Sequence, residues 1–333
     1  MKVAINGFGR IGRSVFRIAD QRTDIEIIAI NDLVDPDALR YLLEYDTVMG
    51  RFQGPLALED EHLVTRTTRS KLLHERDPTK LPWRELGVDV VVESTGAFRS
   101  RKQVEQHLAA GAGRVVLTVP AKDVIDYTVV IGVNEDGLND EHRIISNASC
   151  TTNCLAPLAK VLNDAFGIVE GVINTVHAYT NDQRLADVPH EDWRRSRAAA
   201  KNIIPTSTGA AKAVGEVLPE LAGKLDGIAA RVPVPDGSVV DLFVELARDV
   251  TVEDVHTVVR EAAKTPRLQG ILQFLNRPLV SSDIIGNSHS SIYDAGFTAV
   301  SGGRYLKSLS WYDNEWGYSN RVCDLLALMG RWG

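Results

Sequence analysis

The sequence predicts an α/β protein of two domains: a doubly wound domain built on a parallel sheet, followed by an α+β domain with a largely antiparallel sheet. Over roughly the first 150 residues, apolar β-branched runs alternate with helical segments, as in a parallel sheet covered on both faces. After Cys150 the pattern changes to runs that alternate apolar and polar residues. A chain of 333 residues has room for two domains at roughly 100–200 residues each.

The elements of the first domain follow in order. A strand, a glycine turn, a helix and a second strand occupy about thirty residues, which is the length of a βαβ unit. Later apolar runs continue the alternation. Strands are predicted at residues 3–6, 25–30, 88–92, 115–119 and 127–133, and helices at residues 10–19 and 101–110.

The second domain begins with a helix and continues with alternating strands. Residues 180–201 carry several arginines and little regular period, which predicts a long functional loop. A closing helix has its apolar positions on one face and is expected to pack on the first domain. We therefore predict a first domain at 1–149, completed by the C-terminal helix 315–333, and a second at 150–314. Helices are predicted at residues 151–166, 208–218, 252–264 and 315–329, and strands at residues 169–177, 228–234, 239–247 and 305–311.

Charge and composition exclude several classes of protein. The net charge of −7 opposes adsorption to nucleic acid or to an anionic membrane, so we expect no primary nucleic-acid role. No apolar run approaches the roughly 20 residues that cross a bilayer, and the sequence opens in a strand rather than a signal peptide. Three cysteines are too few for a disulfide framework. We expect a cytoplasmic protein with reduced thiols and no membrane contact.

A glycine pattern follows the first predicted strand and opens the first helix. In a dinucleotide fingerprint, Gly7 permits the tight turn, Gly9 lets the backbone approach a pyrophosphate, and Gly12 allows close packing of helix and strand. Asp32 ends the second strand, where an acidic side chain accepts hydrogen bonds from ribose hydroxyls and disfavours a 2′-phosphate. A chance glycine pattern, and a turn or capping role for Asp32, remain alternatives.

Cys150 precedes a predicted helix, where the helix dipole favours a thiolate and hence a nucleophile. Cys154 falls one turn later and is expected to be a small core residue. A zinc site at these two cysteines lacks a second ligand pair, so no metal is predicted. His177 ends a strand and is a candidate base for Cys150, although a histidine there can equally be structural.

Four segments of the chain together resemble the phosphorylating, NAD-dependent glyceraldehyde-3-phosphate dehydrogenases of bacterial type, and the similarity runs from Met1 to about Met329. The Ser-Cys-Thr-Thr-Asn-Cys segment is among the most specific short signatures of that family. The segments are Ile5-Asn6-Gly7-Phe8-Gly9-Arg10-Ile11-Gly12-Arg13, Ser146-Asn147-Ala148-Ser149-Cys150-Thr151-Thr152-Asn153-Cys154, Ile204-Pro205-Thr206-Ser207-Thr208-Gly209-Ala210-Ala211-Lys212 and Trp311-Tyr312-Asp313-Asn314-Glu315-Trp316-Gly317-Tyr318.

The resemblance implies an oxidoreductase of glycolysis and gluconeogenesis. It converts D-glyceraldehyde 3-phosphate and inorganic phosphate to 1,3-bisphosphoglycerate while reducing NAD. Cys150 attacks the aldehyde to form a hemithioacetal, and His177 takes the proton as hydride leaves. Phosphate then cleaves the resulting thioester. The family is usually a homotetramer, and Leu33 and Pro189 resemble its NAD-using members, although use of NADP as well stays open.

The resemblance also assigns binding residues. Asp182 is implied to orient Arg231, which lies in an apolar strand and is expected to have a buried anionic partner. The cofactor residues implied are Gly7, Gly9, Arg10, Ile11, Gly12, Asp32, Arg76, Thr118, Asn314 and Tyr318. The residues implied for the substrate phosphate and the attacking phosphate are Ser149, Thr151, Thr180, Asp182, Arg195, Thr208, Gly209 and Arg231.

Alternatives remain for individual residues and for the function. Arg195 and its neighbours Arg194 and Arg197 can form a solvated or subunit-facing cluster, and Tyr318 can be an ordinary helix residue. The rival enzyme is an erythrose-4-phosphate dehydrogenase, which shares the cysteine and histidine but usually lacks the Thr180 and Thr208 patterns seen here. A rival of another class is a non-catalytic nucleotide-sensing or interaction protein on the same fold.

Overall fold

The computed structural model describes residues 1–332, and its chain forms two compact units. The N-terminal unit contains Met1–Val129, Glu135–Ser149 and residues 319–332, and the C-terminal unit contains Val130–Asn134 and Cys150–Tyr318. The predicted segment 315–333 ends at Gly333, which lies outside the described residues. Within residues 1–332, no helix is both long and apolar enough to cross a membrane.

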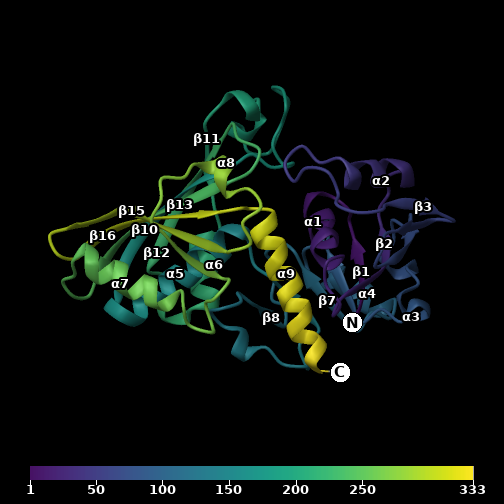
Figure 1. Ribbon diagram of the computed structural model, residues 1–333, viewed down its shortest axis with the longest axis horizontal. Coiled ribbons are helices and arrows are strands. Elements are labelled where there is room, and N and C mark those ends of the chain that lie inside the picture. The colour runs from purple at the N-terminus through teal and green to yellow at the C-terminus, as the bar shows by residue number, and fades with distance from the viewer. Residues whose placement is uncertain (333) are drawn as a thin grey trace. The chain divides into compact units, whose positions relative to one another are not determined.

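The N-terminal unit is built on a sheet that has nine strands within the described residues, in the order β3-β4-β5-β2-β1-β6-β7-β9-β8 (Figure 1). All pairings are parallel except β3 with β4 and β4 with β5, so the predicted doubly wound, parallel sheet is confirmed. The strands are β1 (Lys2–Asn6), β2 (Glu26–Asn31), β3 (Ala57–Glu59), β4 (His62–Val64), β5 (Arg69–Leu73), β6 (Val90–Glu93), β7 (Arg114–Leu117), β8 (Tyr127–Thr128) and β9 (Ile144–Ser146). The helices are α1 (Arg10–Ala19), α2 (Pro36–Glu44), α3 (Trp83–Leu86) and α4 (Arg101–Ala109), with single 3₁₀ turns at Pro78–Lys80 and Glu135–Gly137.

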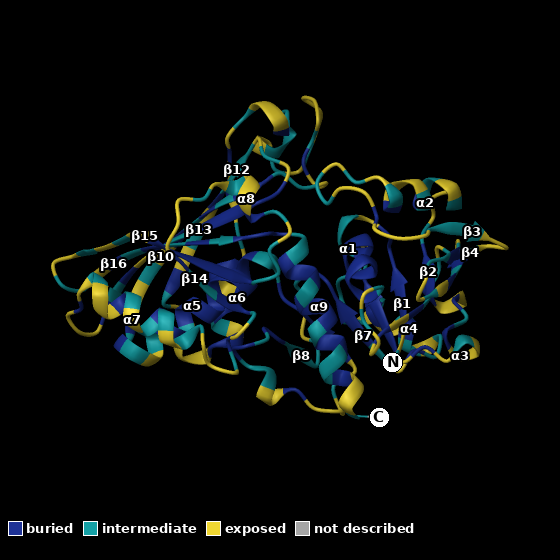
Figure 2. Ribbon diagram, viewed as in Figure 1, coloured by how far each residue is buried: buried dark blue, intermediate teal, exposed yellow. Residues whose placement is uncertain are grey.

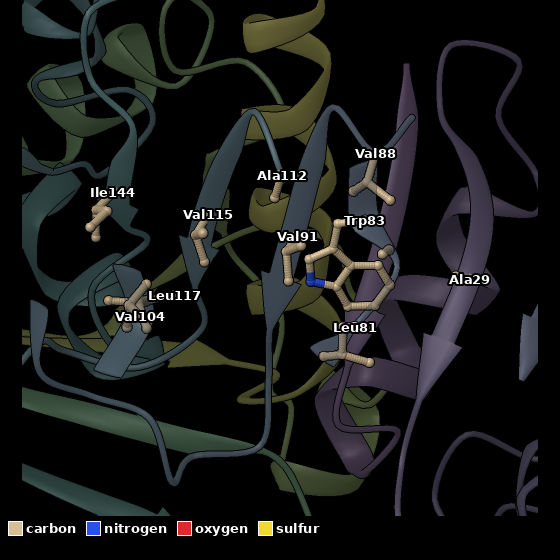
Figure 3. Close-up of a cluster of buried hydrophobic side chains, with 11 residues drawn as sticks. Ala29, Leu81, Trp83, Val88, Val91, Val104, Ala112, Val115, Leu117 and Ile144 are labelled. Atoms are coloured by element: carbon tan, nitrogen blue, oxygen red, sulfur yellow. The ribbon is translucent and has the colours of Figure 1, made fainter. Parts of the chain in front are cut away.

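The β-branched runs of β6 and β7 are buried because helices cover the sheet. Trp83 of α3 and Val104 of α4 pack against Val91, Val115 and their neighbours on one face (Figure 3). Burying each such side chain stabilises the fold by about 1.5–3 kcal/mol. Continuous apolar strands of this kind are the expected consequence of a parallel sheet with both faces covered.

Helix α1 is buried along most of its length (Figure 2). Part of its cover comes from the end of the chain, where helix α9 (Trp316–Met329) is followed by a 3₁₀ turn at Gly330–Trp332. The thiol of Cys323 in α9 contacts the carbonyl oxygen of Val15 at 3.7 Å. Residues 319–332 therefore belong to the N-terminal unit and contact α1.

The C-terminal unit is built on a sheet that has seven strands within the described residues, in the order β11-β12-β10-β13-β16-β15-β14. Four pairings are antiparallel and two, β10 with β12 and β14 with β15, are parallel. Helices α5, α6 and α7 pack against this sheet (Figure 1). The strands are β10 (Ile168–Ala178), β11 (Ile204–Ser207), β12 (Leu225–Val232), β13 (Ser238–Leu246), β14 (Leu272–Leu275), β15 (Ser291–Ser301) and β16 (Tyr305–Tyr312). The helices are α5 (Cys150–Phe166), α6 (Ala210–Val217), α7 (Val252–Ala262) and α8 (Ser281–Ile284), with 3₁₀ turns at Arg194–Ser196, Ala199–Lys201 and Pro219–Leu221.

Several strands differ from the prediction, and the short strands β3, β4, β5, β11 and β14 were not predicted. The strand predicted at residues 127–133 ends at Thr128, because the chain turns there and residues Val130–Asn134 belong to the C-terminal unit. Strand β15 was not predicted, since its pairing with β16 shifts register between Asp294 and Ala299 and interrupts the alternation of apolar and polar residues. The predicted loop at 180–201 contains two short 3₁₀ turns and an isolated β-bridge between Arg184 and Ala198.

Candidate active site

The glycine turn lies at the carboxyl edge of the N-terminal sheet. Strands β1, β2 and β6 end in register, with Asn6 opposite both Asn31 and Glu93. The N–H of Gly7 donates to the carbonyl oxygen of Asn31 at 2.8 Å. Parallel strands bind ligands at this edge, where the loops beyond their carboxyl ends meet.

Asp32 braces the same turn. Its Oδ2 atom accepts a hydrogen bond from the N–H of Phe8 at 2.7 Å, and its Oδ1 atom accepts one from the N–H of Val34 at 3.1 Å. The turn role that was an alternative for Asp32 is therefore present in the structure. A carboxylate oxygen has more than one acceptor position, so these bonds leave Asp32 able to accept from a ribose hydroxyl as well.

The three glycines of the turn have different surroundings. Gly7 has a φ of +93°, and a Cβ atom there would lie 2.6 Å from the nitrogen of Thr95. A Cβ atom on Gly12 would lie 2.2 Å from the carbonyl oxygen of Gly7. A Cβ atom on Gly9 would meet no heavy atom within 4 Å. Gly7 and Gly12 thus permit close packing, whereas Gly9 leaves open space before the N-terminus of α1, where an anion is stabilised.

The remaining predicted cofactor residues are divided between the units. Arg10 forms an ion pair with Asp46, and Arg76 is exposed. Thr118 is buried beyond β7, and its hydroxyl donates to the carbonyl oxygen of Glu93 at 3.1 Å. Ile11 is partly buried in the first turn of α1. Asn314 and Tyr318 are buried residues of the C-terminal unit.

Cys150 and His177 are brought together in the C-terminal unit. Cys150 is the first residue of α5 and His177 is near the end of β10, and Sγ of Cys150 lies 3.5 Å from Nε2 of His177. Nδ1 of His177 lies 2.7 Å from the carbonyl oxygen of Ala178, which can only accept. We therefore assign the ring proton to Nδ1, which leaves the lone pair of Nε2 facing the thiol.

Burial of this pair opposes the sequence-based prediction of a thiolate. Burial raises the pKa of the Cys150 thiol to about 11, although the charge of Arg231 and hydrogen bonds from Thr151 act in the opposite direction. Burial and the charge of Arg231 lower the pKa of His177 to about 3. The prediction considered the helix N-terminus alone, and desolvation outweighs it. Burial therefore opposes both charged forms, the thiolate and the imidazolium.

Arg231 places a positive charge beside this pair. Its Nη1 atom donates to Oγ1 of Thr180 at 2.8 Å and to the carbonyl oxygen of Ala178 at 3.2 Å. Its Nε atom is buried and has no hydrogen-bond partner among the described residues. The predicted buried anionic partner is thus replaced by neutral oxygens. A guanidinium group in this state favours an incoming anion, since a buried charge is costly without a counter-charge.

Asp182 is connected to Arg231 through the hydroxyl of Thr180. The hydroxyl of Thr180 donates to Oδ1 of Asp182, and Oδ2 of Asp182 lies 2.7 Å from Nη1 of Arg195. Burial opposes ionisation of Asp182, but the Thr180 bond and the two arginines outweigh it and lower its pKa. Arg195 also donates to Oγ1 of Thr206 at 3.0 Å. The two arginines are therefore joined through Thr180 and Asp182.

Helix α6 begins close to the strand that Arg195 contacts. Thr206 belongs to β11, and Thr208 and Gly209 directly precede α6. The hydroxyl of Thr208 accepts from the N–H of Ala210 at 3.2 Å, and a Cβ atom on Gly209 would meet no heavy atom within 4 Å. Open space at the start of this helix suits an anion. Ser149, which is also predicted to bind phosphate, precedes Cys150 and is partly buried.

Tyr312 was not predicted to belong to the site. Its buried hydroxyl lies 2.9 Å from Oγ1 of Thr151 and 2.9 Å from Oγ1 of Thr175, and its ring meets that of His177 edge to face. It joins the start of α5 to β10 and so holds the two elements that carry Cys150 and His177. The only sequence signal for Tyr312 was its place in the Trp-Tyr-Asp-Asn segment, and nothing in that segment indicated that its side chain is buried.

Comparison with known proteins agrees with the two-unit fold. Residues 1–101 match the model of the glyceraldehyde 3-phosphate dehydrogenase NAD binding domain, and residues 149–314 match that of the C-terminal domain. The chain is 56% identical over 339 residues to glyceraldehyde-3-phosphate dehydrogenase of Mycolicibacterium smegmatis, covering 99% of each chain. It is 57% identical to that of Borreliella burgdorferi over 98% of each chain, and 54% identical to that of Geobacillus stearothermophilus over 100% of this chain and 99% of the relative. The chain belongs to the glyceraldehyde-3-phosphate dehydrogenase family.

The family models divide the site as the structure does. The glycine turn and Asp32 lie inside the NAD binding domain of the glyceraldehyde-3-phosphate dehydrogenase family, so NAD is the cofactor that the family assigns to this region. Cys150, His177 and Arg231 lie inside its C-terminal domain. Among the described residues, no cluster of His, Cys, Asp and Glu side chains is placed to hold a metal ion.

Proposed function

We propose that this chain oxidises D-glyceraldehyde 3-phosphate with NAD and phosphorylates the product to 1,3-bisphosphoglycerate. The observation that carries the proposal is the distance of 3.5 Å between Sγ of Cys150 and Nε2 of His177, beside the guanidinium group of Arg231, whose Nε atom has no hydrogen-bond partner among the described residues. The family membership and the names of the relatives support the same reaction. They do not favour an erythrose-4-phosphate dehydrogenase or a non-catalytic protein.

The geometry of the pair explains how the nucleophile is generated. Nε2 of His177 accepts the thiol proton, and Sγ of Cys150 bonds to the aldehyde carbon. The carbonyl oxygen takes this proton from His177 and becomes the hydroxyl of a hemithioacetal, which leaves Nε2 free to act as a base again. His177 next accepts the proton of that hydroxyl, and the carbon that loses a hydride becomes the carbonyl of a thioester on Cys150. Inorganic phosphate then attacks this carbonyl and releases the thiolate, which is reprotonated.

The residues of the glycine turn fit the cofactor that the family implies. Gly9 leaves room before α1 for a pyrophosphate, and the carboxylate of Asp32 favours the ribose hydroxyls of NAD over the 2′-phosphate of NADP. We assign Arg10, Ile11, Arg76 and Thr118 to the same ligand, and Asn314 and Tyr318 to its nicotinamide end. Bound NAD supplies the acceptor for the hydride.

Two anion sites follow from the arginines. Arg231 and Thr180 are assigned to the phosphate of the substrate, with Asp182 supporting Thr180. Arg195, Thr208 and Gly209 are assigned to the attacking phosphate, together with Ser149 and Thr151. Guanidinium groups and hydroxyls are suited to this task because they donate several hydrogen bonds to phosphate oxygens.

Assembly as a homotetramer in the cytoplasm is part of the proposal. The C-terminal sheet exposes apolar side chains, since Val172 is 56%, Phe243 46% and Tyr305 58% exposed. Val172 and Phe243 are direct cross-strand neighbours on β10 and β13. An exposed apolar surface of this kind favours association with a second copy. Light scattering that reports a monomer at micromolar concentration would contradict this part of the proposal.

The two units are assigned to the two halves of the reaction. We assign NAD binding to residues 1–149 with the C-terminal helix 315–333, and catalysis to residues 150–314. The experiment that tests the function is the initial rate of NADH formation from glyceraldehyde 3-phosphate, with and without phosphate. Erythrose 4-phosphate and NADP serve as comparators. Rapid NAD reduction that requires phosphate supports the proposal, whereas activity only with erythrose 4-phosphate contradicts it.

A further inference from the structure

Two buried aspartates lie together near the nucleophile. Asp236 lies in the turn between β12 and β13, Asp313 lies between β16 and α9, and each is only 1% exposed. Their carboxyl groups are within hydrogen-bonding reach of each other. Oδ2 of Asp236 is buried without a donor among the described residues. Two ionised carboxylates have no hydrogen to share and repel one another, so this arrangement requires a proton.

The backbone donors around the pair indicate which carboxyl group carries that proton. Asp313 accepts from the N–H groups of Gly286 at 2.7 Å, Glu315 at 2.9 Å and Trp316 at 2.6 Å. Asp236 accepts from one N–H, that of Gly237 at 2.8 Å. Three donors favour an ionised carboxylate, whereas one leaves the carboxyl group neutral. Asp236 is therefore the protonated partner and donates to Asp313.

The charges that face Asp236 come from the elements packed around it. Two of these charges, Asp313 and Glu315, lie near the start of α9 and act on Asp236. The charge of Asp236 in turn acts on the thiol of Cys150 at the start of α5. Burial and these two carboxylates raise the pKa of Asp236 to about 9. Burial also raises the pKa of Asp313, against its hydrogen-bond donors.

The turn that carries Asp236 reaches the catalytic histidine through one serine. Oγ of Ser238 accepts from the N–H of Ala178 at 3.0 Å and donates to Oδ1 of Asn314 at 2.6 Å. The carbonyl oxygen of Ala178 in turn accepts from Nδ1 of His177. Gly237 has a φ of +82°, and a Cβ atom there would lie 2.2 Å from the carbonyl oxygen of Ser281. The turn is thus closely packed and has little freedom to move.

We propose that Asp236 and Asp313 share one proton and act as a positioning pair, joining the turn before β13 to the start of α9 and thereby holding His177 and Asn314 in place. This inference rests on the proposed function, in which His177 is the base and Asn314 binds the nicotinamide end of NAD. Neither aspartate touches the reacting atoms. Loss of the shared proton at alkaline pH leaves two buried negative charges, which separates the two segments and misplaces both residues.

The test compares the parent protein with Asp236→Asn, whose amide group donates to Asp313 at every pH and still accepts from Gly237. We expect the parent to lose kcat as pH rises through about 9, in line with the pKa of Asp236. We expect Asp236→Asn to lower kcat at neutral pH by less than about fivefold and to lack this alkaline decline. Asp249→Asn, which changes an exposed carboxylate after β13, is the control and should keep the parent's profile.

A measurement independent of activity completes the test. At neutral pH the infrared spectrum of the parent should contain the carbonyl stretch of a buried protonated carboxylic acid, and Asp236→Asn should lack it. The same alkaline decline in both proteins, or the same carbonyl band in both, would refute the proposal that Asp236 and Asp313 share a proton. If the parent produces no NADH from glyceraldehyde 3-phosphate, the proposed function fails, but the infrared comparison still decides whether the proton is shared.

Discussion

The two halves of the site are built in different ways. The glycine turn uses backbone groups of one short stretch, and its shape depends on the absence of side chains at Gly7 and Gly12. The Cys150 centre uses side chains from α5, β10 and β12, which the sheet of the C-terminal unit brings together. Local sequence therefore marks the first half, although Asp32 and Thr95 also surround the turn, whereas the protonation states of the second half depend on burial by residues distant in sequence.

The largest effect is expected at Cys150, where the two halves can be separated. Cys150→Ala removes the atom that forms the covalent intermediate, so turnover should fall by at least ~10³-fold. Binding of NAD, followed by quenching of protein fluorescence, should remain because the glycine turn is unchanged. Appreciable turnover by this variant would refute covalent catalysis, and loss of NAD binding would show that the two halves are not independent.

Arg231 should come next, because it serves both the anion site and the pKa of His177. Arg231→Gln should lower kcat/KM for glyceraldehyde 3-phosphate by roughly 10²–10³-fold, as expected for loss of a charge-assisted phosphate contact. His177 remains buried, but without the neighbouring charge its pKa should rise above about 3. The pH dependence of kcat/KM reports pKa values of the free enzyme. The acidic limb of this profile should therefore move to higher pH.

The control for this variant is Arg194→Gln, which changes an exposed arginine in the loop at 180–201. It should leave both the rate and the pH profile close to those of the parent. If Arg231→Gln lowers kcat/KM without moving the acid limb, then burial alone sets the pKa of His177. The electrostatic coupling between Arg231 and His177 would then be absent.

The glycines test the other half of the comparison. Gly12→Ala places a Cβ atom 2.2 Å from the carbonyl oxygen of Gly7, so it should destabilise the protein by about 1–3 kcal/mol, as overpacking does. Gly9 has a φ of −73°, which alanine accepts, and Gly9→Ala should unfold near the parent's temperature. Its Cβ atom occupies the space assigned to the pyrophosphate, so the Kd for NAD should rise about tenfold or more.

These two variants are each other's control, since one changes packing and the other changes space for a ligand. Thermal unfolding and NAD titration should therefore rank them in opposite orders. A Gly9→Ala protein that binds NAD like the parent would place the pyrophosphate elsewhere. A Gly12→Ala protein as stable as the parent would show that the turn can relax.

The extent to which sequence predicted the structure follows the same division. Helix α1 was predicted at residues 10–19 and is found at Arg10–Ala19, because strand, turn and helix signals lie next to one another. The proximity of Cys150 and His177 was predicted through resemblance, and the structure brings them together. The helix N-terminus that favours a thiolate is visible in sequence, whereas the desolvation that opposes it is not.

Contacts made by side chains from separate strands were the hardest to predict. Asp182 was expected to orient Arg231, but the route was not foreseen. A short turn brings Asp182 to the Thr180 hydroxyl, which Arg231 contacts, and the loop at 180–201 brings Arg195 to it. Asp236 and Asp313 are 77 positions apart in sequence and meet only because β13 and β16 are neighbours, with Ser238 opposite Tyr312. No local pattern indicates such a pairing.

The smallest effect is expected at Tyr312, which supports the catalytic centre without taking part in the chemistry. Tyr312→Phe keeps the ring that meets His177 but removes the hydroxyl that joins Thr151 to Thr175. Leaving these buried hydroxyls without a partner should cost about 1–3 kcal/mol of unfolding free energy, measured by urea denaturation. We expect kcat to fall by less than about tenfold, because the positions of Cys150 and His177 become less well defined while their chemistry is retained.

The control is Tyr305→Phe, which changes an exposed tyrosine of the same strand and should change neither the unfolding free energy nor kcat appreciably. A larger loss of kcat than of stability in Tyr312→Phe would instead give its hydroxyl a direct part in proton transfer.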